Sequence, residues 1–213
     1  MIKKGEEVRK DYSDYVLSTR KYGIQGAPWN KFFDLNIVKK YSIKYPELRR
    51  HQDEGFISSY VCHTKEIRFI NDVLYSHYLN DLKKEWDKYP VDYVDAVIGL
   101  YKIRQETILA WNNEDKKTRE IVEHEYICNI IKALELSYSP KMKFNRKERL
   151  KWIKKQIEKS QILKVVMPLS LGRYQKILFI LLKKQYIFVA MLIMHIKIVI
   201  EKNGFLEFFR KFQ

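Results

Sequence analysis

The spacing of apolar residues after Pro90 constrains the fold of this chain more than any other feature. Apolar side chains recur there every three or four residues, as they do on one face of an α-helix. The first helical stripe consists of Val94, Val97, Ile98, Tyr101 and Ile108. A second stripe follows a polar break at 112–115 and consists of Ile127, Ile130, Ile131 and Leu134. We therefore expect the chain to be helical over roughly its last two-thirds.

Local signals predict further helices towards the C-terminus. Asn145 and Glu148 can form a capping box, in which both side chains accept hydrogen bonds from free backbone N–H groups at a helix start. That helix should extend to about Ser160. After a proline break we expect helices over 172–184 and 186–202, and another in the tail. The seven Gly and five Pro are too few for a β fold with many turns.

Helix signals in the N-terminal part are shorter. We expect a short helix over 11–21 and another over 35–40, where the carboxylate of Asp34 can accept a first-turn N–H group. Pro46 holds its neighbour extended and predicts a turn. A third helix should cover 52–63.

Alternating apolar residues after these helices predict a strand pair. Ile67 and Phe69 would lie on one strand, Val73 and Tyr75 on the next, with the connection at 71–72. The sequence thus predicts an α+β, mostly helical fold in three parts: a small α/β piece over 1–81, a helical extension over 82–140 and a basic amphipathic helical region over 141–213.

Four short blocks occur in a characteristic order in the first part. Residues 26–33 read GAPWNKFF, 51–56 read HQDEGF, 65–70 read KEIRFI and 74–78 read LYSHY. In this order and spacing they resemble the C-terminal, acceptor-side half of a family 2 glycosyltransferase of the GT-A fold, of the type that builds bacterial surface polysaccharides. The resemblance implies that 1–81 is a partial GT-A domain.

The resemblance also implies a catalytic residue. It places the general base of the family on Asp53, for inverting transfer of a sugar from a nucleotide sugar to a cell-surface polysaccharide or lipid-linked acceptor. A carboxylate can take the proton of the attacking hydroxyl, and the start of a helix favours its charged form. The alternative is a surface Asp that only completes the first helical turn.

Further site residues follow from the same resemblance. The predicted substrate-binding residues are Trp29, Asn30, Lys31, Gln52 and Glu54. Trp29 offers a flat apolar face for a sugar ring and Lys31 a charge for a phosphate, although a core Trp beside a solvated Lys would give the same pattern. His77 is the predicted metal ligand, with a purely structural His as the alternative.

The chain departs from the family in two respects. Gln52 stands where the family has the Glu of an acidic pair, and the D-x-D motif that holds a divalent metal, Mn²⁺ or Mg²⁺, is missing. No Gly-rich phosphate loop replaces it. We therefore expect a truncated or split enzyme that binds its nucleotide sugar and glycan acceptor only when an N-terminal half supplies the donor and metal site. An incomplete α/β domain would also expose apolar surface, which predicts self-association.

The positive charge of the chain is concentrated at one end. Residues 141–213 hold 18 Lys or Arg and four acidic residues, whereas 1–140 hold 23 and 22. Basic residues around apolar, aromatic-bearing helices suit an anionic membrane surface. The alternative is a helix that packs its apolar face on the protein. Nucleic acid is not an expected partner, because no binding motif accompanies the charge.

Two further features bear on location. Cys62 and Cys128 form no motif, which is typical of buried thiols in a reducing compartment. No apolar run follows the first lysines, so no secretory signal is expected. These features predict a cytoplasmic protein, peripheral at the inner face of the cell membrane. The alternative function is a non-enzymatic helical protein, derived from such an enzyme, that binds a membrane or a partner.

Overall fold

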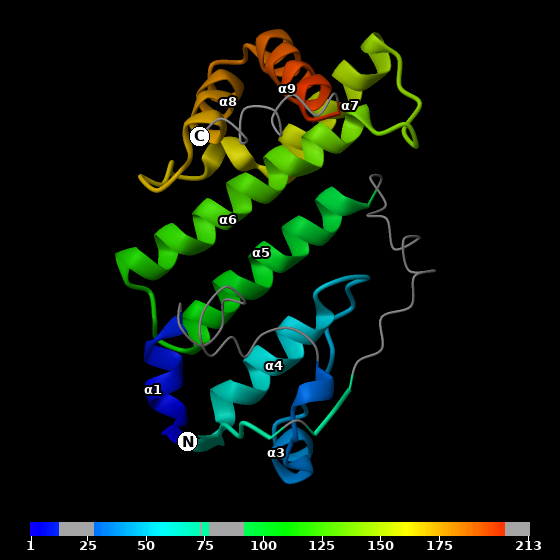
Figure 1. Ribbon diagram of the computed structural model, residues 1–213. Helices are drawn as coiled ribbons and strands as arrows, with labels where there is room; N and C mark the ends of the chain where they lie inside the picture. Colours follow the sequence, from blue (N-terminus) through cyan, green and yellow to red (C-terminus); the bar gives the residue numbers. More distant parts are fainter. Residues whose placement is uncertain (13–27, 73, 77–91, 203–213) are drawn as a thin grey trace, which may run out of the picture. The chain divides into compact units, whose positions relative to one another are not determined.

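The chain is mostly helical in the computed structural model, as predicted, with one small two-stranded sheet among the described residues (Figure 1). The structure describes residues 1–12, 28–72, 74–76 and 92–202. These belong to two compact units: Met1–Asp87 with Ile98–Val122, here unit 1, and Lys88–Val97 with Glu123–Gln213, here unit 2. The predicted α+β class is confirmed, whereas the assignment of 1–81 to a GT-A domain and the three-part division stay predictions.

Short helices make up most of unit 1 as far as residue 76. They are α1 (Gly5–Lys10), the 3₁₀ turn Pro28–Asn30, α3 (Leu35–Lys40) and α4 (Gln52–His63). The predicted cap of α3 is confirmed, since the Asn36 N–H donates to Asp34 Oδ1 at 2.8 Å. The predicted bounds of α3 and α4 are also correct. The helix expected over 11–21 falls almost wholly outside the described residues.

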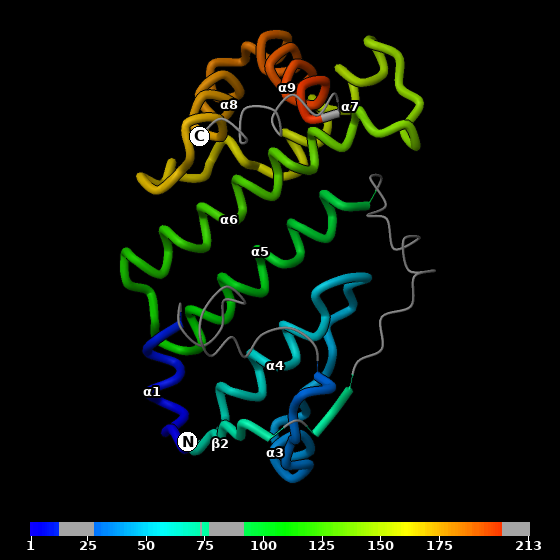
Figure 2. The backbone as a smooth tube through the Cα atoms, in the orientation of Figure 1, coloured from blue at the N-terminus to red at the C-terminus, as the bar shows by residue number. Residues whose placement is uncertain are grey.

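The strand pair has a different partner from the one predicted. β2 (Glu66–Arg68) pairs antiparallel with β1 (Ile2–Lys4), so that Lys3 lies opposite Ile67. The Phe69 N–H donates to the carbonyl of Met1 at 2.7 Å, which extends the pairing to the N-terminus beside β2 (Figure 2). Residues 74–76 form no strand. The predicted hairpin connection at 71–72 lacks the glycine that a tight turn favours. The N-terminal segment is therefore the better partner for β2.

The core of unit 1 lies around α4. Its buried residues are Val8, Tyr12, Ile43, Phe56, Ile57, Val61, Ile108, Trp111 and Val122. Burial of each large apolar side chain contributes about 1.5–3 kcal/mol. The indole N–H of Trp111 donates to the Ser58 carbonyl at 3.2 Å, which ties α4 to the end of α5 (Tyr93–Ala110). On the inner face of α4, a Cβ at Gly55 would lie 2.6 Å from Pro46 Cγ, so only glycine lets the turn approach this closely.

Unit 2 contains the long helices of the C-terminal part. They are the second part of α6 (Lys116–Glu135), α7 (Arg146–Ser160), α8 (Arg173–Lys183) and α9 (Ile187–Lys202), with 3₁₀ turns at Leu136–Tyr138 and Ile162–Lys164. The capping box of Asn145 and Glu148 is confirmed, and α7 ends at Ser160 as predicted. The second apolar stripe is fully buried: Ile127, Ile130, Ile131 and Leu134 are at most 2% exposed. The expected helix in the tail lies outside the described residues.

Candidate functional site

The two most specific motif blocks pack against each other in unit 1, although some twenty residues separate them. The ring of Phe33 from the first block meets Phe56 of the second edge-on, with a centroid distance of 5.2 Å, and meets Tyr60 in the same way at 5.0 Å. The Asp34 N–H donates to the Tyr60 hydroxyl at 2.7 Å. These contacts hold the 3₁₀ turn that carries Trp29 and Asn30 close to the first turn of α4.

Asp53 is the second residue of α4 and is partly exposed. His51 precedes the helix with φ 63°, a left-handed conformation, and its side chain makes no cap hydrogen bond. Asp53 and Glu54 are the acidic side chains of the first turn, where free N–H groups and the helix dipole favour negative charge. The charge of Asp53 also acts on two neighbours, Lys31 and His51, whose pKa values it raises against the effect of their burial.

Lys31 is the basic group of this site. Burial lowers its pKa to about 8, and the charge of Asp53 offsets part of that effect. Its ammonium group donates to Asn30 Oδ1 at 2.6 Å. A lysine of this kind exchanges its proton near neutral pH, whereas an exposed lysine stays charged to about pH 10.

His51 lies in more positive surroundings. Burial and the charges of Arg104 and Arg50 lower its pKa, while Asp53 raises it in part. Its imidazole is therefore neutral at pH 7, and one ring nitrogen can accept a hydrogen bond. Sequence reasoning missed His51, because a single histidine before a helix carries no pattern of its own.

Aromatic rings provide an apolar surface beside these groups. Trp29 is 51% exposed, so the alternative of a core Trp is wrong. The ring of Tyr75 lies 6.5 Å from that of Trp29, tilted by 33°, which forms an open aromatic corner. The flat faces of such rings suit the apolar face of a sugar. Tyr75 belongs to the block 74–78 and to the predicted strand, but its pairing with Trp29 had no sequence signal.

Glu54 differs from the other predicted binding residues, because it is buried. Its carboxylate receives hydrogen bonds from Arg104 of α5, at 2.8 Å from Nε and 3.4 Å from the second guanidinium nitrogen. A carboxylate enclosed in this way is not on a surface that a substrate reaches. We assign Glu54 instead the role of a positioning residue that fixes the first turn of α4 next to Asp53. A signal existed, since Arg104 interrupts the apolar face between Tyr101 and Ile108.

The remaining predicted residues are placed as follows. Asn30 and Gln52 are both exposed, and His77 lies outside the described residues. Within the described part of the chain, no group of three or more His, Cys, Asp or Glu is arranged to hold a metal ion. The divalent metal expected for the intact family enzyme therefore stays a prediction.

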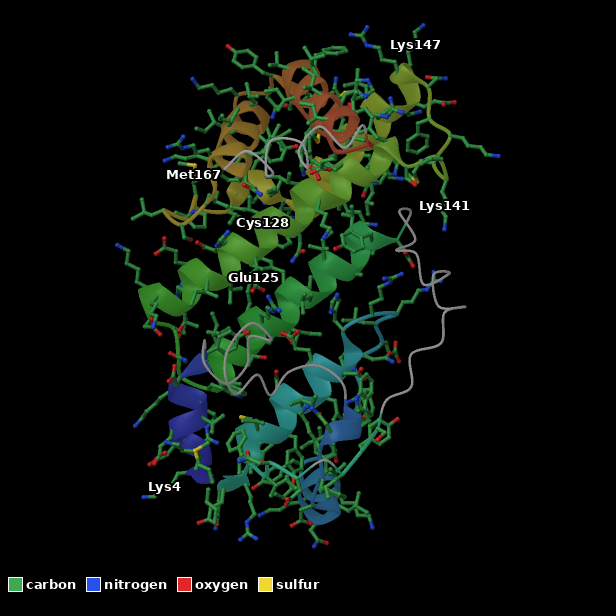
Figure 3. The ribbon with its side chains drawn as sticks, in the orientation of Figure 1. Lys4, Glu125, Cys128, Lys141, Lys147 and Met167 are labelled. Carbon is green, nitrogen blue, oxygen red and sulfur yellow. The ribbon has the colours of Figure 1, made fainter. Side chains whose placement is uncertain are left out.

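Both cysteines are free thiols and partly buried. Burial, assisted by the charge of Glu125, raises the pKa of Cys128 to about 11, so its thiolate is scarce at neutral pH. Figure 3 shows Cys128 and Glu125 on α6. The sequence predicts buried thiols, whereas both cysteines are only partly buried in the structure.

No protein-family model, curated protein or solved structure matches the chain. The site must therefore be judged on its own geometry. It combines a carboxylate at a helix start, a lysine of lowered pKa, a neutral histidine and an exposed aromatic corner. Such a set can remove a proton from a hydroxyl group and bind a sugar ring beside it.

Proposed function

We propose that this chain is the acceptor-side half of an inverting, family 2-type glycosyltransferase, with Asp53 as its general base. The observation that carries the proposal is the packing of the two motif blocks through Phe33 and Phe56, together with the electrostatic interaction between Lys31 and Asp53. A helix can begin at a solvent-exposed surface without exposed aromatic rings or a half-buried lysine beside it. Packing and charge alone therefore do not explain why these groups lie at the start of α4.

The proposed reaction is a single displacement. The oxygen of an acceptor hydroxyl attacks the anomeric carbon of the donor sugar, and its proton passes to the carboxylate of Asp53. The bond between the anomeric carbon and the diphosphate oxygen breaks, and the nucleoside diphosphate leaves with the bonding electrons. A well-placed base contributes about 10²–10⁴-fold to the rate of such a step.

Neighbouring groups would orient the reactants. Trp29 and Tyr75 would hold the acceptor ring by stacking, and Lys31 would donate to an acceptor hydroxyl or a donor phosphate. Glu54 and Arg104 would keep the first turn of α4 in place, so that Asp53 meets the hydroxyl at a fixed position. A separate donor-side half would bring the nucleotide sugar and the divalent metal, which neutralises charge on the leaving diphosphate when bound.

The test is a calorimetric titration of the chain with a uridine diphosphate sugar and Mn²⁺. It is run on the chain alone and then on a mixture with the donor-side half of a family 2 enzyme. We expect binding only in the mixture, and its loss when the D-x-D motif of the added half is mutated. No binding in either case would contradict the enzymatic proposal.

Substitution of the base then tests the chemistry in the active mixture. Asp53→Asn should lower the rate of sugar transfer by about 10²–10⁴-fold while donor binding persists. Asp72→Asn removes an exposed carboxylate from the same unit and serves as the matched control. An equal loss in both variants would mean that the effect is not specific to Asp53.

A second candidate function, the non-enzymatic membrane-binding protein, is favoured by a separate observation. Within the described residues, no helix has the length and apolarity needed to cross a bilayer. Yet α9 turns large apolar side chains to the solvent, among them Phe188 and Leu192. We propose a peripheral position at the inner face of the membrane for either function.

A further inference from the structure

Between Ile187 and Ile200, the exposed positions of α9 include no Lys, Arg, Asp or Glu. They are Phe188, Val189, Leu192, His195, Ile196 and Val199. The five apolar members are between 40% and 58% exposed. At 100° per residue these positions fall on one continuous stripe along the helix. A solvent-facing helix side normally carries charges, so a stripe of this composition indicates a surface that another apolar phase covers.

Lys197, in the second half of α9, is turned towards the rest of unit 2, whereas Glu201 near the end of the helix is exposed. The ammonium group of Lys197 contacts both carboxylate oxygens of Glu135 at 2.9 Å, and also lies 3.7 Å from Glu201. The Tyr174 hydroxyl donates to the same carboxylate of Glu135. This network fixes the rotation of α9 about its axis and keeps Lys197 away from the apolar stripe.

Basic residues lie at the N-terminal end of the stripe. The exposed side of α8 consists of Arg173, Lys176, Ile177 and Ile180, and it ends at Lys183 and Lys184 just before α9. The guanidinium of Arg146 lies 5.7 Å from the ring of Phe188, and Lys147 extends outwards from the start of α7 (Figure 3). The sequence has no acidic residue between Glu158 and Glu201.

We propose that this surface docks on an anionic phospholipid bilayer, with α9 lying in the plane of the headgroups. The lipid-docking face is defined as Phe188, Val189, Leu192, Ile196 and Val199 together with Lys183 and Lys184. Its aliphatic side chains enter the acyl boundary, while the lysines at its end meet lipid phosphates. The proposal rests on the membrane-binding function proposed above and specifies its surface and its lipid class, but it is independent of glycosyl transfer.

Charge decides between a bilayer and a second copy of the chain. A two-fold dimer through α9 would bring together two copies of a region with a large positive excess, since 141–213 hold 18 Lys or Arg and four acidic residues. An anionic leaflet instead complements this positive excess. The length of α9 also fits, because 16 residues span about 24 Å, less than the roughly 30 Å of a hydrocarbon core.

Vesicle flotation of the full chain tests the proposal. We expect the protein to float with vesicles that contain phosphatidylglycerol in phosphatidylcholine, and to float at least tenfold less with pure phosphatidylcholine. High salt should release much of the bound protein, because the phosphate contacts are screened. Absence of binding to the anionic vesicles would overturn the proposal.

Substitutions separate the apolar contribution from the electrostatic one. Leu192→Ser/Ile196→Ser should weaken vesicle binding by roughly tenfold or more, since two aliphatic groups no longer leave water. Both side chains are already exposed, so thermal unfolding should be almost unchanged. Leu109→Ser removes an equally exposed leucine on α5 and should bind as the wild type does.

The lysines are tested in the same way. Lys183→Gln/Lys184→Gln should weaken binding to anionic vesicles by roughly 30-fold, about fivefold for each charge. Lys102→Gln/Lys117→Gln removes two exposed charges from unit 1 and serves as the control.

Two outcomes distinguish this inference from its competitors. If the Leu192→Ser/Ile196→Ser variant lowers the sedimentation coefficient but leaves vesicle binding intact, the stripe is a dimer interface and the lipid proposal is wrong. Asp53→Asn should bind vesicles as the wild type does. Loss of transfer and loss of lipid binding are therefore separate results.

Discussion

Each unit contains a glutamate paired with a basic side chain beside the residues to which we assign a function, but the two pairs differ in exposure. Glu54 and Arg104 in unit 1 each have side chains only 7% exposed, whereas Lys197 and Glu135 in unit 2 are 32% and 13% exposed. The first pair lies next to Asp53 and the second lies behind the apolar stripe of α9. The comparison shows that the ion pair next to the proposed catalytic position is shielded from water, whereas water can reach the pair behind the lipid-docking face.

Removal of the buried cation should have the largest effect on stability. Arg104→Met leaves the carboxylate of Glu54 enclosed without its guanidinium partner, and we expect a loss of about 3–5 kcal/mol in the free energy of unfolding. Urea denaturation measures it. The double variant Glu54→Gln/Arg104→Met should recover part of the loss, because it removes the uncompensated charge. An unchanged free energy of unfolding in Arg104→Met would break the distinction between the two pairs.

The pair of Lys197 and Glu135, which is more exposed than that of Arg104 and Glu54, should tolerate the loss of its basic partner better. Lys197→Met leaves Glu135 with the Tyr174 hydroxyl and access to water, so we expect a loss of about 1–2 kcal/mol. The same denaturation experiment in 0.5 M salt should reduce the difference from the wild type, since water and ions reach this pair. A loss as large as that of Arg104→Met would show that exposure is not what separates the two sites.

A smaller effect concerns the titration of Lys31. Its pKa of about 8 in the folded protein lies below the ordinary value of 10.5, so between these pH values the unfolded chain binds more protons than the folded one. This group therefore makes the protein more stable as the pH rises through that range, and destabilises it below. The free energy of unfolding of the wild type, relative to Lys31→Met, should increase between pH 8 and pH 10. A flat or falling difference would contradict the assigned burial of Lys31.

The smallest expected change sharpens the link between Lys31 and Asp53. Asp53→Asn removes a charge that raises the pKa of Lys31, so the pKa should fall further below 8. NMR of the ¹³C-methylated lysine follows this titration directly. Asp72→Asn should leave the Lys31 titration unchanged.

How much of the fold the sequence predicts depends on whether the signals are local. The starts of α3 and α7 were predictable because Asp34 and Asn145 satisfy N–H groups within three residues of themselves. The partner of β2 was not, since β1 lies some sixty residues earlier and its three residues show no clear alternation. Pairing between distant strands depends on which strand edge is still free in the folded chain. A short stretch of sequence does not contain that information.

The site follows the same division. Trp29, Lys31 and Asp53 could be selected from motif blocks. The blocks do not predict that Lys31 and Asp53 lie close enough to interact, because this depends on the packing of Phe33 on Phe56. The neighbours of Glu54 in sequence do not indicate its burial; the signal lies fifty positions away, in Arg104 on an otherwise apolar helix face. What sequence reasoning lacked was the identity of the side chain across each interface.

Gly55 limits which substitutions α4 can tolerate. In the middle of a helix glycine is the poorest choice after proline, by about 1 kcal/mol relative to alanine. Routine stabilisation by Gly→Ala exchange would nevertheless fail here, because the added methyl group would displace Pro46 and, with it, Tyr45, whose ring stacks on Phe56 at 4.4 Å. An engineer who wishes to rigidify α4 must therefore redesign the 45–46 turn in the same step.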